Sequence, residues 1–72
     1  MKNARTRHTV TAWRKGDLDR WNVSIDLLAR GFMLDYRLIR EFNSRNAAIA
    51  AGKKYAQKLS LPFVDETEIN HR

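Results

Sequence analysis

The chain has 72 residues, with 14 lysines and arginines against 8 aspartates and glutamates, and no cysteine. This length allows a single domain, and the lack of cysteine excludes disulfides, a cysteine nucleophile and cysteine-ligated zinc or iron–sulfur sites. The net charge of +6 favours polyanionic partners such as nucleic acid, an anionic membrane surface or an acidic protein. No apolar run approaches the ~20 residues that span a bilayer, so we expect a cytoplasmic protein without a membrane partner.

The positive charge is concentrated in two segments. Residues 1–20 carry six lysines and arginines against two acids, and residues 43–61 carry four against none. We predict that residues 1–7 form a flexible basic arm. Residues 8–15, rich in threonine, valine and tryptophan, suit a strand, and the glycine and aspartates at 16–19 suit a turn.

The stretch from residue 20 to residue 42 fits two interpretations. As a hairpin, alternating apolar residues form two runs on either side of Arg30-Gly31, where glycine supplies the positive φ of a short turn. As a helix, Leu18, Trp21 and Ile25 fall at helical spacing, which would give a basic all-α domain resembling helix-turn-helix proteins. We favour the hairpin, because the alternation is unbroken and a strand at residues 8–15 needs a partner.

The next segment predicts a helix at about residues 45–59. Ser44 suits the N-cap and the alanine-rich run has high helix propensity. Small residues on one stripe, among them Ala48 and Gly52, would let the helix lie close to a sheet. Lysines 53, 54 and 58 fall off this stripe and are expected to face water, with a phosphate-facing ridge as the alternative. Pro62 ends the helix, residues 61–65 suit a short fourth edge strand, and residues 65–72 suit a polar tail.

Together these elements predict an α+β fold in one domain over residues 8–64: a three-stranded antiparallel sheet with one C-terminal helix on one face (βββα). The even-numbered residues from Phe32 to Leu38 and the odd-numbered residues from Trp21 to Leu27 should face the helix. The opposite, open face should then carry Asn22, Ser24, Asp26, Met33, Asp35, Arg37 and Ile39.

Two motifs resemble those of known DNA-binding domains. W-x-V-x-I at residues 21–25, followed after a hairpin by F-x-S-x-x-x-A at residues 42–48, is similar to the Apetala-type domains of plant regulators and to the arm-binding domains of phage tyrosine integrases. This resemblance covers about residues 8–59. It implies three strands plus one packed helix, with the sheet face away from the helix entering the major groove of DNA.

The candidate nucleic-acid contacts are basic or aromatic. The arm contributes Lys2, Arg5 and Arg7, and the parity of the first strand places Trp13 on the outer face, where it would stack on a base. The position-by-position resemblance adds Arg14, Lys15, Arg20 and Arg37.

Nothing in the sequence indicates an enzyme, a cofactor or a metal site. His8 and His71 lie near opposite ends of the chain, whereas a metal site needs three or four converging ligands. No serine has a histidine and an aspartate in a catalytic arrangement, and no glycine-rich phosphate loop is present.

Two functional hypotheses follow. The first is a small nucleic-acid-binding protein of the phage or mobile-element type that binds double-stranded DNA in preference to RNA. The second is a protein-interaction module, which would act as a homodimer or as an inhibitor of a nucleic-acid-handling complex, with an acidic protein as a further candidate partner. Met33, Asp35 and Ile39 on the open face would form its interface, and the carboxylates expected on that face favour this second hypothesis.

Overall fold

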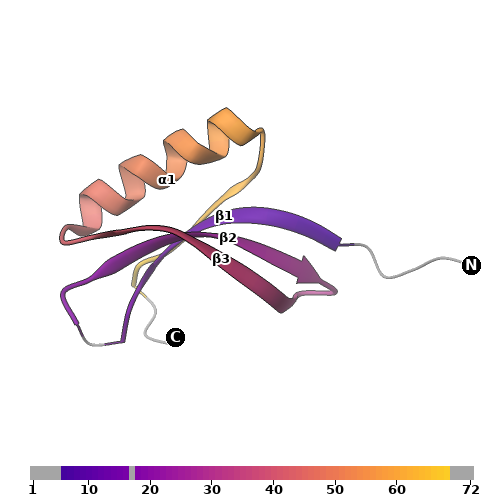
Figure 1. The fold of residues 1–72 in the computed structure, drawn as a ribbon, viewed down its shortest axis with the longest axis horizontal. Helices are drawn as coiled ribbons and strands as arrows, with labels where there is room; N and C mark the ends of the chain where they lie inside the picture. The colour runs from indigo at the N-terminus through magenta and orange to yellow at the C-terminus, as the bar shows by residue number, and fades with distance from the viewer. Residues whose placement is uncertain (1–5, 17, 69–72) are drawn as a thin grey trace, which may run out of the picture.

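The computed structural model describes residues 6–16 and 18–68, which form an α+β fold with one helix packed on one face of a sheet (Figure 1). The elements in chain order are β1 (Thr6–Arg14), β2 (Trp21–Ala29), β3 (Phe32–Phe42), α1 (Arg45–Leu59) and β4 (Phe63–Glu66). The strand order in the sheet is β3-β2-β1-β4. The hydrophobic core lies between the sheet and α1.

The expected hairpin is confirmed, and the helical alternative for this segment is wrong. Arg30 and Gly31 connect β2 to β3 and both have positive φ values, 55° and 81°. Two successive positive φ values are the signature of a two-residue hairpin turn whose twist matches that of the flanking strands. The glycine adopts this conformation without a steric penalty.

The sheet has four strands, not three, because the short edge strand expected at residues 61–65 is present as β4, and its direction makes the sheet mixed rather than antiparallel. β4 lies beside β1 and runs parallel to it, with Val10 opposite Phe63 and Trp13 opposite Glu66. The Val10 amide donates to the Pro62 carbonyl at 2.9 Å. Because α1 carries the chain back along the sheet, the strand that follows the helix runs in the direction of β1.

The helix begins and ends as its sequence predicts. Ser44 is the N-cap, and its hydroxyl accepts a hydrogen bond from the Ala47 amide at 3.3 Å. At the other end Ser60 adopts a left-handed conformation, and the Leu61 amide donates to the Ala56 carbonyl at 2.9 Å. The small residues Ala48, Gly52 and Ala56 are buried, so the helix axis lies close to the sheet.

The hydrophobic core is small because the residues that the helix buries in it are small, namely Ala48, Gly52 and Ala56. Val10 and Ala12 of β1 and Val23 of β2 are fully buried against Ala48 and Ala56. Larger, partly buried side chains surround them: Trp21, Ile25, Ile39, Phe42, Tyr55, Leu61 and Phe63.

The side-chain directions expected for β3 hold at its start, where Phe32 lies opposite Ala29 and Met33 opposite Leu28, and are wrong from Asp35 to Leu38. Tyr36 and Leu38 lie opposite Asp26 and Ser24, on the face away from α1, whereas Arg37 lies opposite Ile25 on the helix side. The ladder between β2 and β3 shifts register between Val23 and Ser24 and again between Leu27 and Leu28. Each such bulge inserts one residue and reverses the alternation beyond it.

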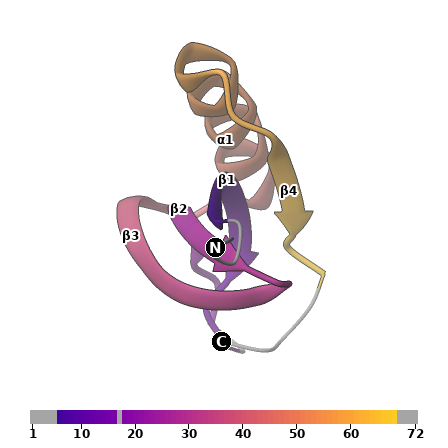
Figure 2. The same ribbon diagram turned by 90° about the vertical axis from the view of Figure 1, so that its right-hand side faces the viewer.

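On β1 and β2 the face away from α1 is polar and buried rather than open. Its fully or nearly fully buried side chains are Thr9, Thr11, Trp13, Asn22, Ser24 and Asp26. β3 curves around below β1 and β2 on this side (Figure 2). The sheet is therefore concave on the face that was expected to be flat and accessible.

Trp13 shows the effect of this curvature. Its indole Nε1 donates to the Ser24 hydroxyl at 2.9 Å, and its ring meets Tyr36 edge to face with centroids 6.0 Å apart. The side chain lies on the outer face as its parity predicts, but only 5% of the residue is exposed. The expectation of an exposed tryptophan is therefore wrong.

Candidate nucleic-acid interface

The structure brings three of the predicted contacts together at the β1–β2 connection, where carboxylates partly neutralise them. The Lys15 amide donates to the Arg20 carbonyl at 3.0 Å, which closes this connection. Arg14 lies 3.7 Å from the Asp19 carboxylate, and Arg20 lies 3.2 Å from that of Glu41. Phosphate would have to compete with these carboxylates for both guanidinium groups.

Arg14 has a further structural role. Its Nε donates to the Leu18 carbonyl at 3.1 Å, and its guanidinium lies 5.8 Å from the centre of the Trp21 ring. These contacts support the β1–β2 connection and hold the guanidinium over the ring.

The other predicted contacts lie elsewhere. Lys2 and Arg5 fall outside the described residues. Arg7 is exposed at the start of β1, at the opposite end of that strand from Arg14. Because Trp13 is buried, it does not offer its ring to a base.

The residues expected to form a protein interface on the open face do not share one face. Met33 lies opposite Leu28, on the side away from α1, whereas Asp35 lies opposite Leu27 on the helix side. Ile39 sits at the register shift and packs partly buried against the core. The bulges in the β2–β3 ladder separate these three side chains.

The described residues form a different basic surface along the line where α1 faces β3. A hollow of about 700 Å³ is lined by Arg40 and Phe42 of β3 and by Ala50, Ala51, Lys54, Tyr55 and Lys58 of α1. A second hollow, of about 360 Å³, continues it along Arg37, Leu38 and Ile39 and shares Tyr55 and Lys58 with the first. We call this continuous feature the basic groove and define its cations as Arg37, Arg40, Lys54 and Lys58.

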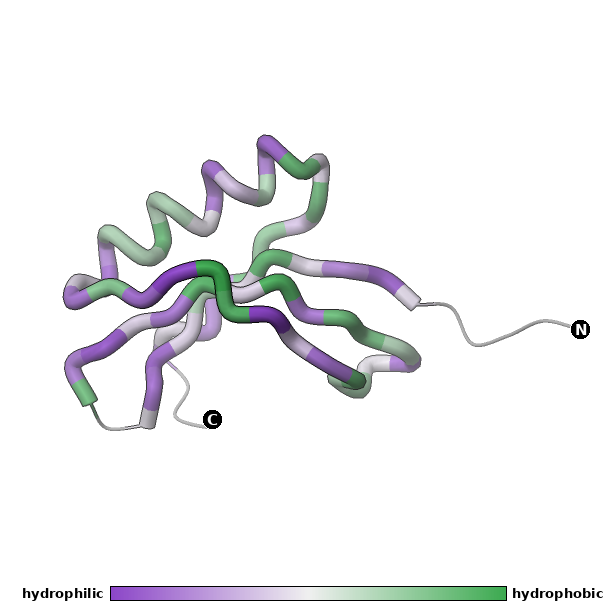
Figure 3. The backbone as a smooth tube through the Cα atoms, in the orientation of Figure 1, coloured by the Kyte–Doolittle hydropathy of each residue, from purple (hydrophilic) through white to green (hydrophobic). Residues whose placement is uncertain are grey.

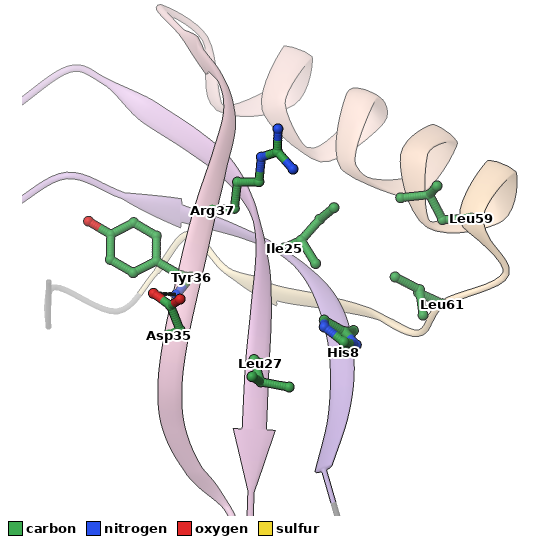
Figure 4. A pocket seen from close by; sticks show the side chains of 8 residues that line it. All are labelled: His8, Ile25, Leu27, Asp35, Tyr36, Arg37, Leu59 and Leu61. Atoms are coloured by element: carbon green, nitrogen blue, oxygen red, sulfur yellow. Dashed lines mark hydrogen bonds between the residues drawn. The ribbon is translucent and has the colours of Figure 1, made fainter.

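The groove continues into a third hollow, of about 410 Å³, at the end nearest the β2–β3 turn. Figure 4 shows this end, where Arg37 extends from β3 toward α1 and Tyr36 points away from it. Ile25, Leu59 and Leu61 supply apolar surface between the two elements. Asp35 is the one carboxylate among the described residues that line the three hollows.

The four groove cations differ from those at the β1–β2 connection in their partners. All four residues are exposed, and among the described residues none of them makes an ion pair. Arg40 lies over the Phe42 ring at 5.2 Å, a contact that orients the guanidinium and leaves its N–H groups available. This arrangement is suited to binding successive negative charges.

Sequence reasoning missed Arg40 and assigned Lys54 and Lys58 to an ordinary water-facing surface. The two lysines are four residues apart and flank Tyr55, so they occupy one side of the helix. That spacing was the available signal. What the sequence did not reveal is that β3, after its bulge, directs Arg37 and Arg40 to the same side of the sheet as α1.

No cluster of three or more histidine, aspartate or glutamate side chains suited to a metal ion occurs in the described part of the chain. Across the same residues, no helix has the length and apolar character needed to cross a membrane.

Comparison with known proteins adds no further assignment. No family model, curated protein or solved structure matches this chain.

Proposed function

We propose that this protein binds nucleic acid, and double-stranded DNA in particular, through the basic groove between α1 and β3. The observation that carries the proposal is that four exposed cations line one groove without an ion-pair partner among the described residues. Arginines and lysines that neutralise phosphates supply most of the affinity of non-specific DNA binding. Tyr55, which is half-buried, lines both hollows of the groove together with Lys58.

This mode differs from the one that the resemblance to Apetala-type and integrase domains implies. In those domains the sheet face away from the helix enters the major groove. In this chain that face is concave, and its Trp13 and Asp26 side chains are buried. The groove on the helix side therefore supports the proposal better than the sheet face does.

The test is fluorescence anisotropy of a labelled mixed-sequence DNA duplex, titrated with the protein at low and at moderate salt. Lys54→Ala/Lys58→Ala should weaken binding roughly tenfold, taking about 0.7 kcal/mol for each exposed phosphate contact. Lys53→Ala is the matched control, because Lys53 is exposed on the same helix and does not line the groove.

Two outcomes would overturn the proposal. Absence of binding at low salt, where electrostatic attraction is strongest, would exclude nucleic acid as the partner. If Arg14→Ala/Lys15→Ala weakens binding and Lys54→Ala/Lys58→Ala leaves the affinity unchanged, the interface lies at the β1–β2 connection. Competition with unlabelled single-stranded DNA and RNA measures the preference for duplex DNA.

A further inference from the structure

β3 is a long edge strand whose apolar side chains are exposed. It has 11 residues, and among the described residues its one strand neighbour is β2. Along it Phe32 is 73% exposed, Leu34 59% and Leu38 50%, and in Figure 3 green apolar segments alternate with purple charged ones along this strand. A long exposed edge of this composition is a template for pairing with another strand.

We propose that β3 pairs antiparallel with β3 of a second copy of this chain, in the register centred on Tyr36. Two identical strands that pair in this way are related by a two-fold axis perpendicular to the sheet. Each residue then lies opposite a residue of the other copy that points to the same face. Within Asp35–Leu38, the regular part of the β2–β3 ladder, neighbouring side chains alternate between the two faces. The two-fold axis must therefore lie at one residue, which pairs with its own equivalent in the second copy, and not between two neighbouring residues.

The charges on β3 select among the possible centres. Centring on Asp35 places two carboxylates opposite each other, and centring on Arg37 places two guanidinium groups opposite each other. Centring on Tyr36 instead places Asp35 of each copy opposite Arg37 of the other, which gives two ion pairs by symmetry. Opposite charges stabilise a cross-strand pair, whereas like charges destabilise it.

The same register also matches the apolar residues. Leu34 of each copy lies opposite Leu38 of the other, and the two Tyr36 side chains meet at the axis. Leu34, Tyr36 and Leu38 are about half-exposed or more in the single chain. Tyr36 and Leu38 lie on the face away from α1, so pairing buries their apolar surface there, while Asp35 and Arg37 lie on the helix side.

One local hydrogen bond is exchanged on pairing. In the single chain the Tyr36 amide donates to the Asp35 carboxylate at 2.8 Å. This bond satisfies a backbone donor within β3 itself. In the paired state the Tyr36 amide donates instead to a backbone carbonyl of the second copy. The Asp35 carboxylate then forms its ion pair with Arg37 of the second copy.

The symmetry has a consequence for the groove, although the pairing does not depend on nucleic-acid binding. A two-fold axis perpendicular to the sheet keeps both copies of α1 on the same face, so that the two grooves lie on either side of the β3 seam. Arg37 then forms an ion pair across the β3–β3 interface, while Arg40, Lys54 and Lys58 of each copy stay available to phosphate.

The experiment is a mass measurement by sedimentation across a concentration series, without nucleic acid. We expect twice the 8.4 kDa of the single chain at high concentration. Asp35→Arg alone and Arg37→Asp alone should each raise the dimer dissociation constant roughly tenfold or more, because each places like charges opposite one another twice. The combined variant reverses both ion pairs and should restore dimerisation to within about threefold.

Lys53→Glu, an exposed charge change on α1, is the control and should leave the dissociation constant unchanged. Circular dichroism shows whether each variant keeps its fold. A monomer at every concentration would overturn the proposal. So would dimerisation that is insensitive to the single swaps, or single swaps that weaken it without rescue by the combined variant. The mass measurement uses no nucleic acid and varies Asp35 and Arg37, whereas the anisotropy titration varies Lys54 and Lys58, so either proposal can fail while the other stands.

Discussion

Replacing Gly52 by alanine sets helix propensity against packing. Alanine stabilises a helix interior by about 1 kcal/mol relative to glycine. At this buried position, however, an added Cβ would overlap the edge of the Phe63 ring, with two further ring atoms at 3.2 and 3.3 Å. Overpacking of this kind destabilises a fold by about 1–3 kcal/mol. We therefore expect Gly52→Ala to lower the free energy of unfolding by about 1 kcal/mol.

The same substitution in a Phe63→Ala background separates the two effects. Without the ring, the propensity gain remains, so Gly52→Ala should raise the free energy of unfolding by about 1 kcal/mol. Urea denaturation followed by circular dichroism measures all four chains. Ala50→Gly, at an exposed position of α1, gives the propensity difference in this helix. An equal gain in both backgrounds would refute the close approach of α1 to β4.

Three further predictions concern charge and hydrogen bonding. Each groove lysine that contacts phosphate adds about 0.9 to the steepness with which log affinity falls against log salt concentration. In Lys54→Ala/Lys58→Ala, the loss of affinity between 50 and 200 mM salt should therefore be about 12 times smaller than in the wild-type chain. An unchanged slope would exclude these contacts. Ser24→Ala should lower the free energy of unfolding by about 2–4 kcal/mol, because the Ser24 hydroxyl accepts from Trp13 at 2.9 Å and donates to Asp26 at 2.8 Å, and both partners are buried; a loss below about 0.5 kcal/mol in urea denaturation would contradict this. The Thr67 amide and hydroxyl both donate to Asp65 and hold the pKa of that carboxyl below its ordinary value of 3.8. A lowered folded-state pKa stabilises the fold above the unfolded-state pKa, and this contribution is lost as pH falls through the folded-state value. The urea midpoint of the wild-type chain should therefore fall more steeply below about pH 4 than that of Asp65→Asn.

Local sequence patterns predicted the elements well, because each has a local cause. The Ser44 cap and the alanine-rich run determine α1, and the Arg30-Gly31 step determines the hairpin. The orientation of β4 has no local cause. Its parallel pairing with β1 depends on the path of α1 across the sheet, which the residues of β4 alone do not specify.

The candidate site was harder to predict, because it depends on two bulges. Strict alternation placed Arg37 on the outer face, and the register shift beyond Leu27 moved it to the helix side. Trp13 was assigned to the correct face, but its burial arises from the curvature that brings Tyr36 toward it. Neither a bulge nor strand curvature leaves a periodic signal in a single sequence.

The parallel pairing of β4 with β1 has a consequence for how the chain folds. Val10 lies opposite Phe63, so the first strand gains its second neighbour only when the last strand arrives. Closing so long a loop is entropically costly, and contacts between distant parts of a chain slow folding. The amides in the part of β1 that has a strand on both sides, Val10 to Trp13, should exchange with solvent only through global unfolding, whereas those on the outer edge of β3 exchange through local opening. The hairpin and the helix therefore belong to one cooperative unit that is completed by the last strand.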